Sequence, residues 1–466
     1  MNTWKPNLEE TKRHYIDWWN HKGIILNMWE HFQEGVTPHA DIPAPPAPKD
    51  LNQQWFDPQW RAEYLDWYVA HSSLKADMLP VANTQLGPGS LAAILGGVFE
   101  GGEDTIWIHP NPNYTDDIRF DENHPNWLLH KELLKACKEK AQGHYYVGMP
   151  DLMEGLDVLA ALKGTDKVLL DTVMQPEVLE HQMQQINDIY FRVFDELYDI
   201  IRERPRVGEQ GSGMGDEMAF CYFSSWAPGK MSKLQSDIST MISEDDYRRF
   251  VQPFIREQCQ KIDYTLYHLD GVGAMHHLPA LLEIEELNAI QWTPGVGQPQ
   301  GGSSKWYDLY RQILEGGKSI MACWVTLDEL RPLLDNVGGD GIHLEMDFHN
   351  EQEVEQAMKI VDDFKAAVHI PARVQAIIEK VEKEVCEPQK KSLSSFLFLF
   401  KKSPRARRRH GHHDSALPTP RRGFPRIPFC KTSADPHGLQ RPALHDLPHR
   451  SSRHPSPLFR GRCRPY

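Results

Sequence analysis

The sequence lacks the long apolar runs that a membrane-spanning helix requires. No stretch approaches the roughly 18 uninterrupted apolar residues that such a helix needs. The N-terminus passes from Met1 directly into charged sequence, without the apolar region of a signal peptide. We therefore expect no association with a membrane.

Cysteine is also scarce. The chain has 7 cysteines among 466 residues, and they form neither a CxxC pair nor a disulfide-like spacing. This usage is typical of a reducing compartment, so the sequence predicts a cytoplasmic protein.

Acidic residues are almost absent from the end of the chain. Residues 388–466 contain 18 Lys and Arg against three Asp and no Glu, whereas residues 1–387 contain 33 basic and 62 acidic side chains. The first part is therefore strongly acidic. Binding to nucleic acid is not expected there, because phosphates are bound by a concentrated positive surface.

The segment 388–466 is basic and rich in Pro, Arg and His, and it shows neither helical nor strand periodicity. It predicts a disordered tail after a folded body over 1–387. Two interpretations are open: a tail that binds anionic partners, or a segment translated out of frame. The composition favours the second.

Within 1–387, short apolar runs alternate with amphipathic segments, the pattern of an α/β fold with a parallel sheet. The predicted strands are Gly23–Trp29, Met78–Asn83, His144–Met149, Arg206–Gln210, Tyr264–Asp270, Ala289–Thr293, Ser319–Trp324 and Gly341–Asp347. The predicted helices are Pro125–Ala141, Pro176–Arg204, Glu244–Ile262, Trp306–Glu315 and Leu327–Asp335. Eight strands favour a (β/α)8 TIM barrel over an open sheet, with a helical and loop cover over about residues 1–75.

Candidate functional residues follow the predicted strands, because such barrels carry their chemistry at the carboxyl ends of the strands. Side chains alternate along a strand, so His268 and Asp270 share one face, as do His343 and Glu345. Further candidates at these ends are Asp151, Gln210, Trp292 and Cys323. We predict that His343 and Glu345 are catalytic and that Gln210 and Trp292 bind the substrate.

Each candidate also has a purely structural interpretation. His268 and Asp270 could be members of a polar pocket, and His343 with Glu345 could be an ion pair. Cys323 could be a buried core residue, and Trp292 could pack in the core instead of forming the wall of a binding site.

Several motifs resemble the uroporphyrinogen decarboxylase superfamily over roughly residues 5–385. They are Tyr267-His268-Leu269-Asp270-Gly271, His277–Glu283, Ala289–Gly295, Gly148–Leu152, Leu86–Gly89 and Asp237–Ser243. The resemblance implies a TIM barrel and either of two activities. One is decarboxylation of a tetrapyrrole, which needs no cofactor; the other is methyl transfer between a corrinoid and a small acceptor.

The decarboxylase alternative requires several arginines for a substrate with many carboxylates. Residues 24–31, which lie where this family has an Arg-rich segment, contain no arginine. Asp151 and Asp237 are the carboxyl groups that would assist protonation in that reaction.

The methyltransferase alternative implies zinc held by a His-x-Cys pair and a later cysteine. This sequence has Asp270 in place of the first cysteine, so His268, Asp270 and Cys323 are predicted to bind Zn²⁺ or another divalent metal. Methylcobalamin would then be a co-substrate. Beside the small-molecule substrate, a corrinoid protein and a second copy of the chain are open as partners. Methyl transfer is the activity we predict, decarboxylation of a tetrapyrrole is the second alternative, and a non-catalytic corrinoid-binding barrel is the third.

We predict that a chain ending at Glu387 folds without the tail, because the periodic sequence ends before that residue. Thermal melting of this truncated chain tests the prediction. A cooperative transition at the temperature of the full-length chain is expected. Insolubility, or loss of the transition, would show that the tail belongs to the fold.

Overall fold

A six-stranded sheet of buried, mostly apolar strands forms the larger part of the fold. In the computed structural model, which describes residues 3–103, 105–203 and 216–367, every pairing in this sheet is parallel and the order is β1-β12-β11-β10-β9-β8. The strands are β1 (Ile24–Asn27), β8 (Met231–Gln235), β9 (Tyr264–Asp270), β10 (Ala289–Thr293), β11 (Ser319–Val325) and β12 (Ile342–Met346). Parallel strands covered on both faces are typically apolar throughout, as most of these are.

A second sheet has the order β2-β5-β6-β7 and is parallel except for the β6–β7 pair. Its strands are β2 (Val81–Ala82), β5 (Tyr146–Met149), β6 (Met218–Phe220) and β7 (Ser225–Ala227). A separate antiparallel hairpin joins β3 (Val98–Gly101) to β4 (Ile106–His109).

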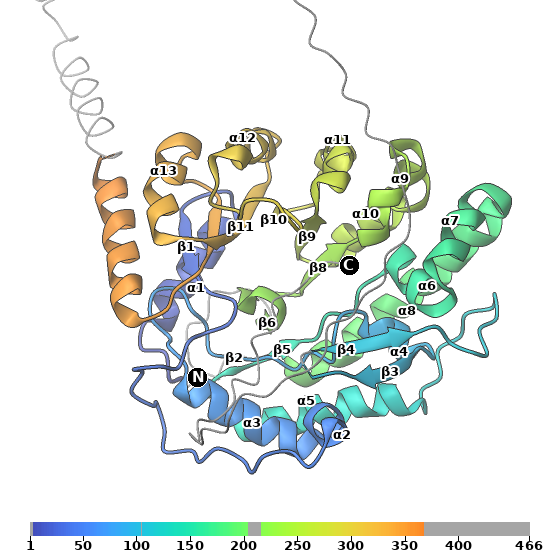
Figure 1. Ribbon diagram of the computed structural model, residues 1–466, viewed down its shortest axis with the longest axis horizontal. Helices are drawn as coiled ribbons and strands as arrows, with labels where there is room; N and C mark the ends of the chain where they lie inside the picture. The colour runs from blue at the N-terminus through green and yellow to red at the C-terminus, as the bar shows by residue number, and fades with distance from the viewer. Residues whose placement is uncertain (1–2, 104, 204–215, 368–466) are drawn as a thin grey trace, which may run out of the picture. The chain divides into compact units, whose positions relative to one another are not determined.

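Helices lie outside the two sheets (Figure 1). They are α1 (Leu8–Trp19), α2 (Leu51–Phe56), α3 (Pro58–His71), α4 (Ser90–Ile94), α5 (Pro125–Ala141), α6 (Gly155–Lys163), α7 (Thr165–Met174), α8 (Pro176–Ile201), α9 (Glu244–Phe250), α10 (Gln252–Lys261), α11 (Leu278–Leu282), α12 (Tyr307–Glu315) and α13 (Leu327–Val337). Short 3-10 turns are η1 (Tyr222–Ser224), η2 (Asp237–Met241), η3 (Val272–His277) and η4 (Ser304–Trp306). Residues 351–367 are also helical, and no helix in the described ranges is long and apolar enough to cross a bilayer.

The α/β class with a parallel sheet is confirmed, and β9 and β10 have the predicted bounds. The sequence did not predict β8, α6 or α7. The helix predicted over Glu244–Ile262 is two helices, because Pro253 stands at the start of α10 and cannot continue α9 without losing a backbone hydrogen bond. The predicted strand Arg206–Gln210 and the boundary at 387 lie outside the described residues.

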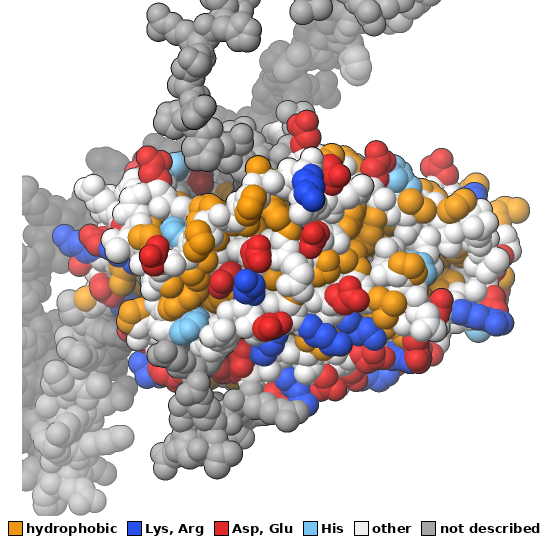
Figure 2. Space-filling model, turned by 90° about the horizontal axis from the view of Figure 1, so that it is seen from below, with side chains coloured by type: hydrophobic (Ala, Val, Ile, Leu, Met, Phe, Trp, Pro, Cys, Tyr) orange, Lys and Arg blue, Asp and Glu red, His pale blue; other side chains and the backbone are white. Residues whose placement is uncertain are grey.

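The described surface carries both charge signs. On the face shown in Figure 2, Asp and Glu side chains are interspersed with Lys and Arg. This face therefore does not present the concentrated positive charge that a phosphate backbone requires.

Both edge strands of the six-stranded sheet, β1 and β8, lie close to the second sheet or to the segment that leads into it. At one edge β6 lies beside β8. At the other, the segment before β2 is hydrogen-bonded to β1: the Asp77 N–H donates to the Leu26 carbonyl at 2.9 Å, and the Asp77 carboxylate accepts from the Leu26 N–H at 3.0 Å. The same carboxylate lies 2.8 Å from His14 Nδ1 on α1, so Asp77 connects three elements.

We expect Asp77→Ala to lower the free energy of unfolding by about 2 kcal/mol, because it leaves the buried Leu26 N–H without an acceptor. Asp340→Ala is the matched control: its carboxylate accepts from the Gly23 N–H at 3.0 Å in an exposed position. Thermal melting compares the two. Equal losses of stability would contradict a special role for Asp77.

Candidate metal centre

Polar side chains from neighbouring parallel strands meet at the carboxyl ends of these strands. His268 on β9 pairs in register with Gln235 on β8 and with Gln291 on β10. Asp270 follows His268 by two positions, so it lies on the same face of β9. This register brings residues from distant parts of the chain to one level of the sheet.

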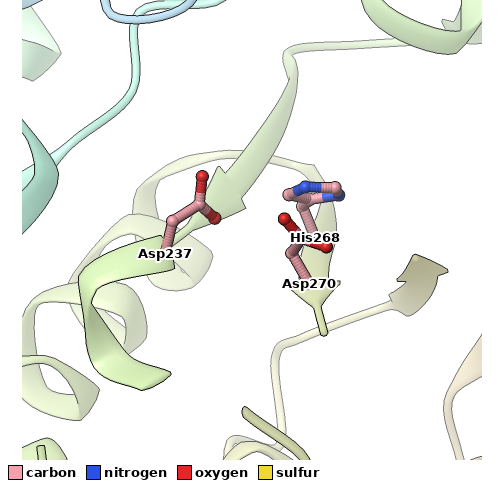
Figure 3. Close-up of side chains that lie close together, drawn as sticks. All are labelled: Asp237, His268 and Asp270. Carbon is pink, nitrogen blue, oxygen red and sulfur yellow. The ribbon is translucent and has the colours of Figure 1, made fainter. Parts of the chain in front are cut away.

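Asp237, His268 and Asp270 form one group at this level (Figure 3). Their ligand atoms all lie within 4.8 Å of one another, and among the described residues no other group of three His, Cys, Asp or Glu side chains could hold a metal ion. Asp237 opens η2 directly after β8, and Figure 3 shows its carboxylate facing the other two side chains.

His268 is neutral and presents an unprotonated nitrogen. Burial and the Lys233 charge lower the pKa of His268 to about 3. Its Nδ1 is hydrogen-bonded to Gln291 Oε1, which can only accept, so Nδ1 carries the proton and Nε2 keeps its lone pair. Gln291 is held in this orientation because its Nε2 donates to Thr293 Oγ1 at 2.8 Å and to Cys323 Sγ at 3.0 Å.

Both carboxylates of the group lack a positive partner of their own. The Asp270 pKa is raised by burial, and its Oδ1 is buried without a hydrogen-bond partner. Asp237 is exposed as a residue, yet its carboxyl is surrounded by protein atoms and lies near Asp157. Both effects raise the pKa of Asp237 well above its usual value. Two carboxyl groups and an imidazole for which no salt bridge is found among the described residues are a suitable ligand set for a divalent cation.

A buried lysine lies next to the group. Lys233 Nζ is 2.7 Å from Asp151 Oδ2, donates to Gln235 Oε1, and stands 4.6 Å from the centre of the Tyr222 ring. The charges of Asp151, Asp237 and Glu154 raise the pKa of Lys233 against the effect of burial, so it is an ammonium.

Asp157, at the start of α6, orients the turn that carries Asp237. Its carboxylate accepts the N–H of Asp237 at 2.8 Å and that of Ile238 at 3.0 Å. Gln235 Nε2 adds a contact to Asp237 Oδ2 at 2.9 Å. The position of Asp237 is therefore fixed by hydrogen bonds to its backbone and to its side chain.

The structure brings together His268 and Asp270 of the predicted ligand set, but not Cys323. The Cys323 sulfur accepts from Gln291, whose other amide atom bonds to His268, so this amide links the two side chains. Burial first, and then Glu345, raise the pKa of the Cys323 thiol well above its usual value. The geometry favours Asp237, predicted as a catalytic carboxyl, as the third ligand instead of Cys323.

His343 and Glu345 lie in the core between β1 and β11. His343 Nε2 is 2.8 Å from Glu345 Oε1, which also accepts from Asn27 Nδ2 at 3.0 Å. The His343 ring is fully buried against the edges of Tyr15 and Trp18. The short Nε2–Oε1 distance agrees with the ion-pair interpretation and leaves the catalytic role a prediction.

The other candidates lie elsewhere. Trp292 is on the face of β10 opposite Gln291 and packs edge-on against Trp306 at 5.1 Å, with no exposed surface. Trp292 therefore packs in the core, as its structural interpretation has it, and does not face the Asp237, His268 and Asp270 group. Asp151 is the partner of Lys233, and Gln210 lies outside the described residues.

Sequence reasoning missed Lys233, Gln235 and Asp157. The sequence holds a usable signal: the motif that begins at Asp237 follows β8 closely, and a strand assigned before that motif places Lys233 and Gln235 at a strand end. No family model matches this chain, and no curated protein matches it either.

We predict that Asp237→Asn weakens binding of Zn²⁺ or Co²⁺, whereas Cys323→Ser does not. Changes in the residues that merely support ligands weaken metal affinity by about 10–100-fold, so loss of a ligand is expected to cost at least as much. Equilibrium titration of the purified variants measures both constants. Tight binding by Asp237→Asn together with weak binding by Cys323→Ser would reverse this assignment.

Proposed function

We propose that this chain is a TIM-barrel enzyme of the uroporphyrinogen decarboxylase superfamily that moves a methyl group between a corrinoid and a small acceptor. In this proposal Asp237, His268 and Asp270 bind a divalent metal. The approach of β6 to β8, and the hydrogen bonds of Asp77 to Leu26, support closure of the two sheets into a barrel.

The observation that carries the proposal is the carboxylate–imidazole–carboxylate group at the carboxyl ends of parallel strands. Active sites of barrel enzymes lie at this end. Three protein ligands leave open coordination positions, as in catalytic metal sites. A bound divalent metal would lower the pKa of the thiol or hydroxyl group of the methyl acceptor.

The residues around the group orient the proposed ligands. His268 offers Nε2 because Gln291 holds the proton on Nδ1. Asp157 holds the turn of Asp237. Tyr222 and Phe223 lie with their ring centres 6.3 Å from that of His268 and place aromatic rings beside it.

The charge of the site favours methyl transfer over decarboxylation of a tetrapyrrole. Within the described ranges, the basic side chain next to the group is Lys233, and Asp151 already pairs with it. A substrate with many carboxylates would meet further carboxylates here, and arginine clusters are the usual receptors for such substrates. The acidic surroundings agree better with a bound metal and an acceptor of low charge.

We expect the metal-loaded protein to demethylate methylcobalamin in the presence of a thiol, a change followed by the absorption of the corrinoid. His268→Ala and Asp270→Asn should slow this reaction about 10³-fold, since metal assistance contributes several kcal/mol to the transition state. The controls are His349→Ala and Asp335→Asn, whose side chains form exposed ion pairs with Glu353 and Arg331.

Other outcomes would replace the proposal. Conversion of uroporphyrinogen without demethylation would identify a decarboxylase. Corrinoid binding without either reaction would identify a non-catalytic barrel. Equal activity of the site variants and the controls would place the site elsewhere.

A further inference from the structure

A small pocket lies behind the carboxyl end of β8, on the side of α8 and α10. Its volume is about 10 Å³, and its lining includes Glu154, Ser236 and Gln258 together with Met183 and Phe254. A cavity of about 10–15 Å³ holds one water molecule when two to four polar atoms are available to bind it. The pocket therefore has the size of a single water site.

Three of the lining side chains supply such atoms. Glu154 Oε2, Ser236 Oγ and Gln258 Oε1 are each buried without a hydrogen-bond partner, and these residues are 3%, 5% and 1% exposed. Unpaired buried polar atoms are costly and therefore rare in folded proteins. Because all three residues line one pocket, a single partner bound there would satisfy their unpaired atoms.

We propose that the pocket binds one ordered water molecule, held by Glu154, Ser236 and Gln258, and that this water fixes the turn that presents Asp237. A water molecule can accept a hydrogen bond from the Ser236 hydroxyl and donate one to Gln258 Oε1. The water then has one further hydrogen bond available for Glu154 Oε2.

The charge state of Glu154 is compatible with this arrangement. Burial, together with the nearby Asp151 and Asp157, raises the pKa of Glu154 well above its usual value, although the Gln235 N–H and Lys233 oppose the shift. A protonated Glu154 donates its O–H to the water.

The site is connected to the metal group through the backbone. The Gln235 N–H donates to Glu154 Oε1, and Ser236 directly precedes Asp237. Glu154 is thus a positioning residue. Its Oε1 accepts a hydrogen bond from Gln235 at the end of β8, and its Oε2 is linked through the water to Ser236. Asp157 fixes the same turn from its other side.

Ser236→Ala tests the inference through the sign of a change in Tm. If the water is present, the substitution removes one of its hydrogen bonds, and Tm falls by about 2 °C. If the pocket is dry, the substitution removes an unpaired buried hydroxyl and Tm rises.

Ser239→Ala is the matched control. Ser239 lies on the same turn, is 1% exposed, and has an unpaired hydroxyl, but it does not line the pocket. Its replacement should leave Tm unchanged or raise it. A rise in Tm for Ser236→Ala as well would overturn the inference.

A high-resolution crystal structure of the full chain gives an independent answer. A density peak within about 2.6–3.2 Å of the three polar atoms is expected, and an empty pocket would refute the water site. Neither measurement depends on metal binding or catalysis, so the inference can fail while the proposed function stands, and the reverse also holds.

Discussion

The buried ion pair between Lys233 and Asp151 is the interaction on which the site depends. Both side chains are almost fully buried, and their charged atoms are 2.7 Å apart. Removing one partner of such a pair leaves an uncompensated charge and is strongly destabilising. Here the ammonium also lowers the pKa values of Glu154 and Asp157, which come from another segment, and of Asp237, which follows β8, against the larger effect of burial.

One ammonium does not compensate all of these carboxyl groups. The pKa values of Asp237 and Asp270 are raised, which means that their charged forms are disfavoured in the isolated chain. His268 is neutral beside them. A divalent cation bound here would favour the charged forms of both carboxyl groups. Metal binding and folding would then stabilise each other.

The sequence predicts the strands that are mostly apolar, β9 with two of the proposed ligands among them, and misses β8, which places Lys233 and Gln235 next to the metal group. β9 and β10 are found within their predicted bounds because burial on both faces leaves them mostly apolar. β8 contains Lys233 and Gln235 in a run of five residues, and no alternation or apolar run marks it as a strand. These same polar side chains surround the metal group.

Other outcomes depend on tertiary contacts. Strand alternation alone predicts that His268 and Asp270 lie on the same face. Their association with Asp237 required the pairing of β8 with β9, which the sequence does not encode locally. The same alternation explains why Trp292 does not face the metal group. Because Gln291 on β10 faces His268, the next residue, Trp292, lies on the opposite face of the strand.

X-ray absorption spectroscopy of the metal-loaded protein tests the central claim most directly, because it reports the elements bound to the metal. Ligation by Asp237, His268 and Asp270 predicts a first shell of oxygen and nitrogen with a single imidazole. Bonds to sulfur near 2.3 Å are the known signature of a cysteine ligand. Their presence, or a protein that binds no metal, would contradict the account.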